Sequence, residues 1–349
     1  MNIVKALAGG ALALGVVAGC GPKGPVLHVY TWSDYIDPEV VAEFEKQNGC
    51  TVAIDTFDSN ESMFAKLQAG SAGYDVIMPT SYQIPLMAKN GMIRKLDKSL
   101  LPNVAKNFDN AYYAAILDKS MDYNVPYAVT YTGFAYRKDK IGNAPIDSWR
   151  VFETEAMKGR MALLADMRET IGGALKYLGY SLNTENPAEI DKAVEQVLKW
   201  KGNIAKFDNE QYKTAVASAE WFVGHGYSSD STQIMEDSED VGFVLPKEGF
   251  AIACDEMVIS ANAPQPELAH KFINFLYDAE IARRNMEYVM APMPVAPALA
   301  ALEGDVKAKV VVPPETLKRG EVLRDFDEKP EIRELYVKAW DRIKAGEAK

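Results

Sequence analysis

The chain has 349 residues, and its 38 Lys and Arg residues against 49 Asp and Glu residues give a formal net charge of −11 at pH 7. An acidic surface repels nucleic acid and anionic membrane surfaces, which argues against both as partners, but it does not disfavour a cationic ligand. The length exceeds what one hydrophobic core usually supports, so the sequence predicts two domains.

The N-terminal segment is typical of an export signal. Lys5 precedes an apolar run over 6–17, which is shorter than the roughly 20 apolar residues of a membrane-spanning helix. The small residues before Cys20 resemble a bacterial lipoprotein signal, which predicts removal of residues 1–19, acylation of Cys20 and a tether over 20–25. The alternative is an ordinary secretory signal with an incidental cysteine. The lipoprotein interpretation places the protein in the periplasm or at the cell surface, anchored to a membrane.

The first hundred residues alternate between predicted strands and helices. Strands are expected at 27–31, 51–57 and 74–78, where β-branched and apolar residues cluster. Helices are expected at 38–48 and 60–69, where apolar residues recur at helical spacing. The first helix follows an N-cap acid, starts with proline and ends before glycine. The order of these elements implies a parallel sheet with right-handed crossovers.

Polar and aromatic residues follow each of these three strands, at the sheet edge where such folds bind ligands. These candidates are Trp32, Ser33, Asp34 and Tyr35 after the first strand, Asp58, Ser59, Asn60 and Glu61 after the second, and Thr80, Ser81 and Tyr82 after the third. Their side chains suit a polar ligand with an apolar middle. Simpler interpretations remain open, because Asp58 and Asn60 can cap the following helix and Trp32 and Tyr35 can pack at a domain edge.

A second unit of alternating elements starts near Tyr131. Its expected elements are strands at 159–165, 241–245 and 256–260 and helices at 166–177, 187–201, 266–277 and 332–343. Cys50 and Cys254 have no spacing typical of a disulfide framework or a zinc site, and pairing between them stays open. Because the three histidines share no metal-ligand spacing and no hydrolase or phosphate-loop motif occurs, we expect no enzyme, no metal and no cofactor.

The segment 27–36, LHVYTWSDYI, closely resembles the start of the bacterial spermidine/putrescine-binding proteins, the receptor subunits of ATP-driven (ABC) polyamine importers. The match continues in order along the rest of the chain, including 57–61, 124–127, 246–249 and 272–276, and is weakest in the middle third. The resemblance implies the α/β, two-lobe periplasmic binding protein fold of type II. Each lobe would be a mostly parallel sheet flanked by helices, with a hinged cleft between the lobes.

The same resemblance implies where the lobes divide. Lobe 1 would comprise 26–131 plus 255–301, and lobe 2 would comprise 132–254 plus 302–349. The chain would cross between the lobes near 131–134, 253–255 and 295–302. The implied partners are a polyamine in the cleft and a membrane permease, with the receptor acting as a monomer.

A polyamine carries ammonium groups on a methylene chain, so its site requires carboxylates for the cations and aromatic faces along the methylenes. The resemblance implies Asp34, Asp166, Glu169, Asp230 and Asp255 as the acids, Trp32, Tyr35, Tyr82 and Tyr227 as the walls, and Ser33, Thr80 and Ser81 as hydrogen-bond partners. For Asp166 and Glu169 the simpler interpretation is a capping box at a helix start.

Three positions depart from the family pattern and leave the length of the ligand open. Ala253 and Ala291 stand where the family has aromatic residues, and Leu323 stands where it has glutamine. Several alternatives therefore stay open. They are another organic cation or an amino-acid derivative, ferric iron held by Tyr112 and Tyr113, and a surface lipoprotein that no longer transports.

Overall fold

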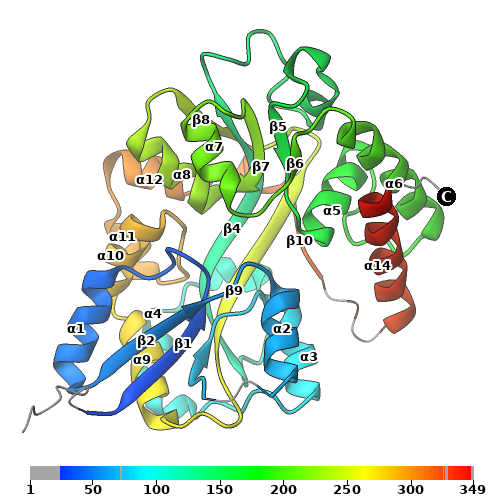
Figure 1. Cartoon of the computed structure of the whole chain (residues 1–349). Coiled ribbons are helices and arrows are strands. Elements are labelled where there is room, and N and C mark those ends of the chain that lie inside the picture. Colours follow the sequence, from blue (N-terminus) through cyan, green and yellow to red (C-terminus); the bar gives the residue numbers. More distant parts are fainter. Residues whose placement is uncertain (1–23, 71–72, 325, 327–328, 347–349) are drawn as a thin grey trace, which may run out of the picture.

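The computed structural model describes residues 24–70, 73–324, 326 and 329–346, and Figure 1 shows its arrangement. The predicted signal at 1–19, Cys20 and most of the predicted tether lie outside the described residues. No helix in the described part combines the length and the apolar character that crossing a membrane requires.

The N-terminal elements are those that the sequence predicts. They are β1 (Val26–Thr31), α1 (Pro38–Asn48), β2 (Thr51–Thr56), α2 (Asn60–Gln68) and β3 (Val76–Ile77). Strand β1 is parallel to both β2 and β3, which confirms the predicted parallel arrangement. Helix α1 begins as expected, because the Asp37 side chain accepts a hydrogen bond from the backbone N–H of Glu39. It ends at Gly49, whose φ of 60° is the left-handed conformation that glycine favours.

The capping interpretation of Asp58 and Asn60 is wrong. Helix α2 is capped by Ser59, whose hydroxyl oxygen accepts from the backbone N–H of Ser62 at 3.2 Å. Asn60 is buried, and its amide donates to the hydroxyl oxygen of Thr80 at 2.9 Å. Asn60 therefore does not cap α2. Its side chain instead links the start of α2 to the loop after β3.

Two long antiparallel strands, β4 (Asn124–Arg137) and β9 (Phe250–Ile259), run through the middle of the molecule (Figure 1). The residue pattern predicted no strand over β4, although the family resemblance implied a crossover at 131–134, and β9 begins at Phe250 rather than at the expected Glu256. Both strands are buried along nearly their whole length. A strand buried on both faces lacks the apolar–polar alternation by which sequence analysis detects strands.

The sheet formed by the described residues has ten strands in the order β2-β1-β3-β9-β4-β7-β5-β6, with β10 paired to β9 and β8 paired to β4. The further strands are β5 (Met161–Leu163), β6 (Lys206–Phe207), β7 (Val223–Tyr227), β8 (Val241–Val244) and β10 (Gly320–Val322). Strand β5 is parallel to β6 and β7. Parallel pairs thus form the outer parts of the sheet, and antiparallel pairs join them through β4 and β9.

Helices flank the sheet on both halves (Figure 1). After α2 they are α3 (Ile84–Lys89), α4 (Pro102–Asn107), α5 (Met167–Tyr177), α6 (Pro187–Lys201), α7 (Gln211–Ala217), α8 (Ser228–Asp237), α9 (Pro266–Leu276), α10 (Ala279–Val289), α11 (Ala296–Ala301), α12 (Gly304–Val310), α13 (Pro314–Leu317) and α14 (Pro330–Ala345). Short 3₁₀ turns cover Ser81–Gln83, Lys98–Leu100, Asn110–Ala115, Trp149–Glu153 and Glu155–Met157. Helices α5, α6, α9 and α14 lie where the sequence predicts them, whereas α10, which is as long as α5 and α9, was not predicted.

Hydrophobic side chains form separate cores in the two halves. One core joins β1, α1, α9 and α10, and in it the rings of Phe44 and Phe272 lie 4.9 Å apart. Another joins α5, α6 and α14 around Trp149 and Trp200, whose rings stack at 5.8 Å. Each half therefore has its own packed interior. Cys50 and Cys254 are both buried and free, so the disulfide that the sequence left open is not formed.

Candidate functional site

A cavity that is partly open to solvent lies between the two halves of the molecule, and its empty space, solvent-open part included, is about 700 Å³. Both halves contribute to its lining. The lining residues are Trp32, Ser33, Tyr35, Asp58, Asn60, Thr80, Tyr82, Thr130, Asp166, Glu169, Asn209, Glu210, Lys213, Tyr227, Ser229, Asp230, Ala253, Asp255 and Leu323. The loops after β1, β2 and β3 supply one side, as expected for the carboxyl ends of parallel strands. The starts of α5, α7 and α8 supply the other side.

The structure brings ten of the twelve candidate side chains to this cavity, and these are Trp32, Ser33, Tyr35, Thr80, Tyr82, Asp166, Glu169, Tyr227, Asp230 and Asp255. Asp34 and Ser81 are not among the lining residues. The Asp34 side chain is 64% exposed. The Ser81 hydroxyl is buried and accepts a hydrogen bond from the backbone N–H of Leu117 at 3.0 Å. Whether any of the twelve contacts a ligand stays a prediction.

Asp255 on β9 is a buried carboxylate with hydroxyl partners only. Thr80 donates to Oδ1 at 2.6 Å, and Tyr35 donates to Oδ2 at 2.5 Å. Burial raises the pKa of Asp255 to about 6, although the two hydroxyl groups act in the opposite direction. No ion pair to Asp255 occurs among the described residues. The carboxylate is therefore held in place while its charge lacks a cationic partner.

Asp166 and Glu169 form a second acidic group at the start of α5. Asp166 caps this helix by accepting from the backbone N–H groups of Arg168 and Glu169 at 2.8 and 3.0 Å, so the capping interpretation of Asp166 is confirmed. Glu169 is 4% exposed, and burial followed by repulsion from Asp166 raises its pKa to about 8. Glu61 on α2 lies near this acidic group. Desolvation, followed by the charge of Asp166, raises the pKa of Glu61 to about 7, although the residue is exposed.

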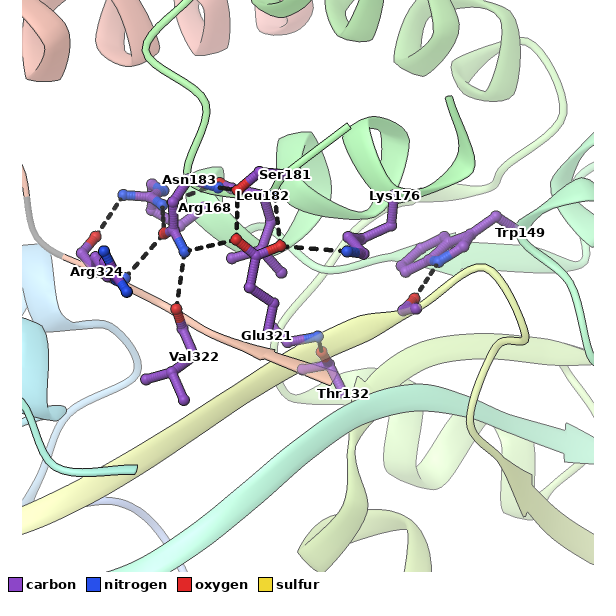
Figure 2. A network of polar contacts seen from close by, with 12 residues as sticks. Thr132, Trp149, Arg168, Lys176, Ser181, Leu182, Asn183, Glu321, Val322 and Arg324 are labelled. Atoms are coloured by element: carbon purple, nitrogen blue, oxygen red, sulfur yellow. Dashed lines mark hydrogen bonds and ion pairs between the residues drawn. The ribbon is translucent and has the colours of Figure 1, made fainter. Parts of the chain in front are cut away.

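Arg168 stands between these two acids in sequence but is not among the cavity-lining residues, and its guanidinium bonds to other groups. Its nitrogens donate to the carbonyl oxygens of Arg324 and Leu182 and to the side chain of Asn183. Figure 2 shows these hydrogen bonds together with the carboxylate of Glu321. Glu321 accepts a hydrogen bond from the backbone N–H of Leu182 at 3.1 Å and forms an ion pair with Lys176 of α5. The network fixes the segment after β10 against α5, which holds Leu323 in the cavity wall.

Asp230 and Lys213 form a third charged group, at the side of the cavity made by α7 and α8. The hydroxyl of Tyr212 donates to Asp230 Oδ2 at 2.6 Å. Lys213 Nζ lies 3.7 Å from Asp230, 3.6 Å from Glu210 and 4.0 Å from Asp34. Burial lowers the pKa of Lys213, but the three carboxylates together outweigh that effect and raise it. This group, unlike the other two, already contains a cation.

Aromatic rings border the carboxylates. Trp32 packs against Phe57 with ring centroids 4.4 Å apart, and its buried indole N–H has no hydrogen-bond partner in the described structure. Tyr35 packs against Tyr127 with ring centroids 5.4 Å apart and also lines the cavity, so it is both a packing residue and a lining residue. The hydroxyl of Tyr82 accepts from the Asn60 amide at 2.8 Å and keeps its own proton available for donation.

The three departures from the family pattern lie in different places. Ala253 and Leu323 line the cavity, so the small and the apolar side chain both shape its wall. Ala291 is fully buried in the core of the first half and is not among the lining residues. Two of the three departures thus bear directly on the shape of the cavity.

Sequence analysis missed Asn209, Glu210 and Lys213 as lining residues. They follow β6, which is parallel to β5, so the rule that picked out the loops after β1 to β3 applies here too. Strand β6 covers only Lys206–Phe207, and such a short segment carries no detectable periodicity.

The residues considered for iron or other metals lie elsewhere. Tyr112 and Tyr113 are not among the cavity-lining residues, and the Tyr113 hydroxyl donates to the carbonyl of Lys119 at 2.6 Å. His270 is structural, because its Nε2 accepts from the backbone N–H of Asp97 at 3.0 Å. His225 is buried against aromatic rings, and burial lowers its pKa to about 3. Within the described ranges, no three His, Cys, Asp or Glu residues gather as metal ligands do.

The family model for bacterial extracellular solute-binding proteins matches residues 39–314. The putrescine/cadaverine-binding protein of Pseudomonas aeruginosa is 35% identical over 332 residues, covering 91% of this chain and 93% of the relative. The spermidine/putrescine-binding periplasmic protein of Escherichia coli is 33% identical over 343 residues, covering 97% of both chains. These matches confirm the resemblance that the sequence analysis identified, and the relatives are named as binding proteins rather than enzymes.

Solved structures of similar proteins confirm the fold class. The TpPotD lipoprotein of Treponema pallidum has a TM-score of 0.82 at 29% identity and covers 91% of this chain and 99% of its own. The spermidine/putrescine substrate-binding protein PotD of Streptococcus pneumoniae, solved with calcium and HEPES, has a TM-score of 0.78 at 30% identity, covering 93% and 100%.

Proposed function

The chain belongs to the family of bacterial extracellular solute-binding proteins, and from this premise we propose that it is the polyamine receptor of an ABC importer. It captures a small linear polyamine such as putrescine outside the cytoplasm and delivers it to a membrane permease. Similarity over nearly the whole chain to relatives named for putrescine, cadaverine and spermidine supports this assignment. The reaction is reversible binding and requires no covalent chemistry.

The observation that carries the proposal is a pair of buried acidic groups in one cavity, neither of which forms an ion pair with the described residues. Asp255 has only hydroxyl donors, and Glu169 is buried beside Asp166 while Arg168 bonds to other groups. Buried carboxylates without a cation are costly, and a bound ammonium supplies the missing charge together with hydrogen-bond donors. An anion receptor would need cationic groups at these same two positions.

In the proposed complex, one ammonium group binds Asp255 and another binds Glu169 and Asp166. The methylenes lie along the rings of Trp32, Tyr35, Tyr82 and Tyr227, which provide apolar contact and attract the cations. Ser33 and Thr80 complete the polar contacts. Asp34 and Asp230 contribute to the site indirectly, through their ion pairs with Lys213. Ser81 contributes indirectly through its hydrogen bond to the neighbouring buried Glu256.

We also propose that the two halves are lobes that close on the ligand, with lobe 1 at 26–131 plus 255–301 and lobe 2 at 132–254 plus 302–349. The separate cores and the two long strands between them support a division into two lobes, although Leu302 and Val310 pack in the core that contains β1 and α1. A ligand that bridges both lobes favours the closed state by its differential affinity, and the permease then recognises that state.

For the N-terminus we propose acylation at Cys20 and a monomeric receptor tethered to the membrane. The pattern of small residues before Cys20 supports this assignment.

Calorimetric titration tests the function directly. The chain without residues 1–19 is titrated with putrescine, cadaverine, spermidine, spermine and agmatine, with glutamate as an anionic control. We expect saturable one-to-one binding of at least one polyamine and none of glutamate. A folded protein that binds no polyamine, or that prefers glutamate, contradicts the proposal.

A further inference from the structure

Among the described residues that line the cavity, Lys213 is the one cation. It lies on α7, and its side chain is 18% exposed. Its ammonium lies within 4.0 Å of three carboxylates, those of Asp34, Glu210 and Asp230. Asp34 comes from the loop after β1, whereas the other two come from the opposite half. A cation of the protein itself therefore occupies an acidic group that joins the two sides of the cavity.

The other two acidic groups contain no such cation. Asp255 is bonded to hydroxyl groups, and Glu169 accepts from the Thr132 hydroxyl. Arg168 makes its hydrogen bonds with Arg324, Leu182 and Asn183 and forms no ion pair with Glu169 or Asp166, although its charge opposes the rise that burial causes in the pKa of both acids. The cavity thus has two acidic groups open to external ammonium groups and a third whose carboxylates already share the ammonium of Lys213.

We infer that Lys213 determines ligand specificity, because its ammonium takes the position of a third ligand nitrogen and so restricts the site to diamines. The inference rests on the proposed function and narrows its substrate class. A triamine that spans the cavity would bring its third ammonium to the acids around Lys213, where like charges a few ångströms apart repel strongly in a partly buried setting. Spermidine must then either leave that nitrogen outside or displace the lysine. A diamine meets Asp255 and Glu169 without this conflict.

The experiment compares ligand preference in four forms of the protein: wild type, Lys213→Gln, Lys213→Arg and Lys338→Gln. The last is the matched control, because Lys338 is an exposed lysine of α14 with a side chain 65% exposed. Putrescine, cadaverine and spermidine are titrated into each form by calorimetry, and folding of each is checked by circular dichroism.

We expect the wild type to prefer a diamine over spermidine. In Lys213→Gln, the ratio of the dissociation constants for the diamine and spermidine should shift about tenfold in favour of spermidine. This is the effect expected when a charge of the same sign as the ligand is removed from a binding site. Lys213→Arg keeps the cation and should keep the wild-type preference, as should Lys338→Gln.

Three results would overturn it. One is a Lys213→Gln protein that binds diamines and spermidine with an unchanged ratio. Another is an equal loss of affinity for all ligands, which a merely structural role predicts. The third is tighter binding of ornithine than of putrescine by the wild type that disappears in Lys213→Gln, because Lys213 would then bind a carboxylate. If neither the wild type nor Lys213→Gln binds any polyamine, the proposed function itself fails, and the inference fails with it.

Discussion

Replacing Asp255 with asparagine should change ligand affinity and protein stability in opposite directions. The substitution keeps the shape of the side chain, and the amide can still bond the hydroxyl groups of Thr80 and Tyr35, which donate to the carboxylate at 2.6 and 2.5 Å. What disappears is the negative charge. A hydrogen bond to a charged partner contributes roughly 1.5–3 kcal/mol, so putrescine binding should weaken by about ten- to hundredfold.

The stability effect follows from the pKa of about 6 that burial gives Asp255 in the folded protein, against an ordinary aspartate pKa of 3.8. Between these two values the folded state binds more protons than the unfolded state, so stability without ligand falls as pH rises toward neutrality. A shift of about two units corresponds to at most about 3 kcal/mol. Asp255→Asn should therefore stabilise the ligand-free protein by about 1–3 kcal/mol at pH 7.5, and this gain should vanish below about pH 4.

Calorimetric titration measures the affinity, and urea unfolding at pH 7.5 and pH 4 measures the stability. Asp305→Asn, at an exposed position of α12, is the matched control and should change neither quantity. An Asp255→Asn protein that binds putrescine as tightly as the wild type would remove Asp255 from the site. A variant that is less stable than the wild type at pH 7.5 would show that the buried carboxylate stabilises the fold.

Three further predictions concern proton release, packing and the N-terminus. Because the pKa of Glu169 is raised to about 8, an ammonium group that binds it should displace a proton at pH 7. The binding enthalpy of the wild type should then vary with the ionisation enthalpy of the buffer. In Glu169→Gln this dependence should be much weaker. Gly226→Ala would bring a Cβ within 2.2 Å of the Tyr212 ring, so it should lower the free energy of unfolding in urea by about 1–3 kcal/mol. The control is Gly202→Ala, where the nearest atom lies at 3.4 Å, and it should lower that free energy less. Cys20→Ala should abolish incorporation of radiolabelled palmitate in cells, and undiminished labelling would refute acylation at that residue.

The sequence by itself determined the elements whose signals are local. The acid and proline before α1, the glycine after it and the helical spacing of its apolar residues lie within a dozen positions of one another, so α1 was predicted with its observed limits. The same holds for the parallel arrangement of β1, β2 and β3, which follows from the order of strands and helices. The loops after these strands could therefore be identified as one edge of the site.

Only the tertiary structure decided how charges pair across the cavity. Lys213 lies within 4.0 Å of Asp34, far away along the chain, and no local pattern encodes that approach. Arg168 follows Asp166 closely in sequence, yet its guanidinium is drawn to the carbonyl oxygen of Arg324 because that segment packs against α5. Coulomb interactions depend on distance and burial rather than on sequence order. Which of the described acids lack an ion pair therefore follows from how the two halves pack.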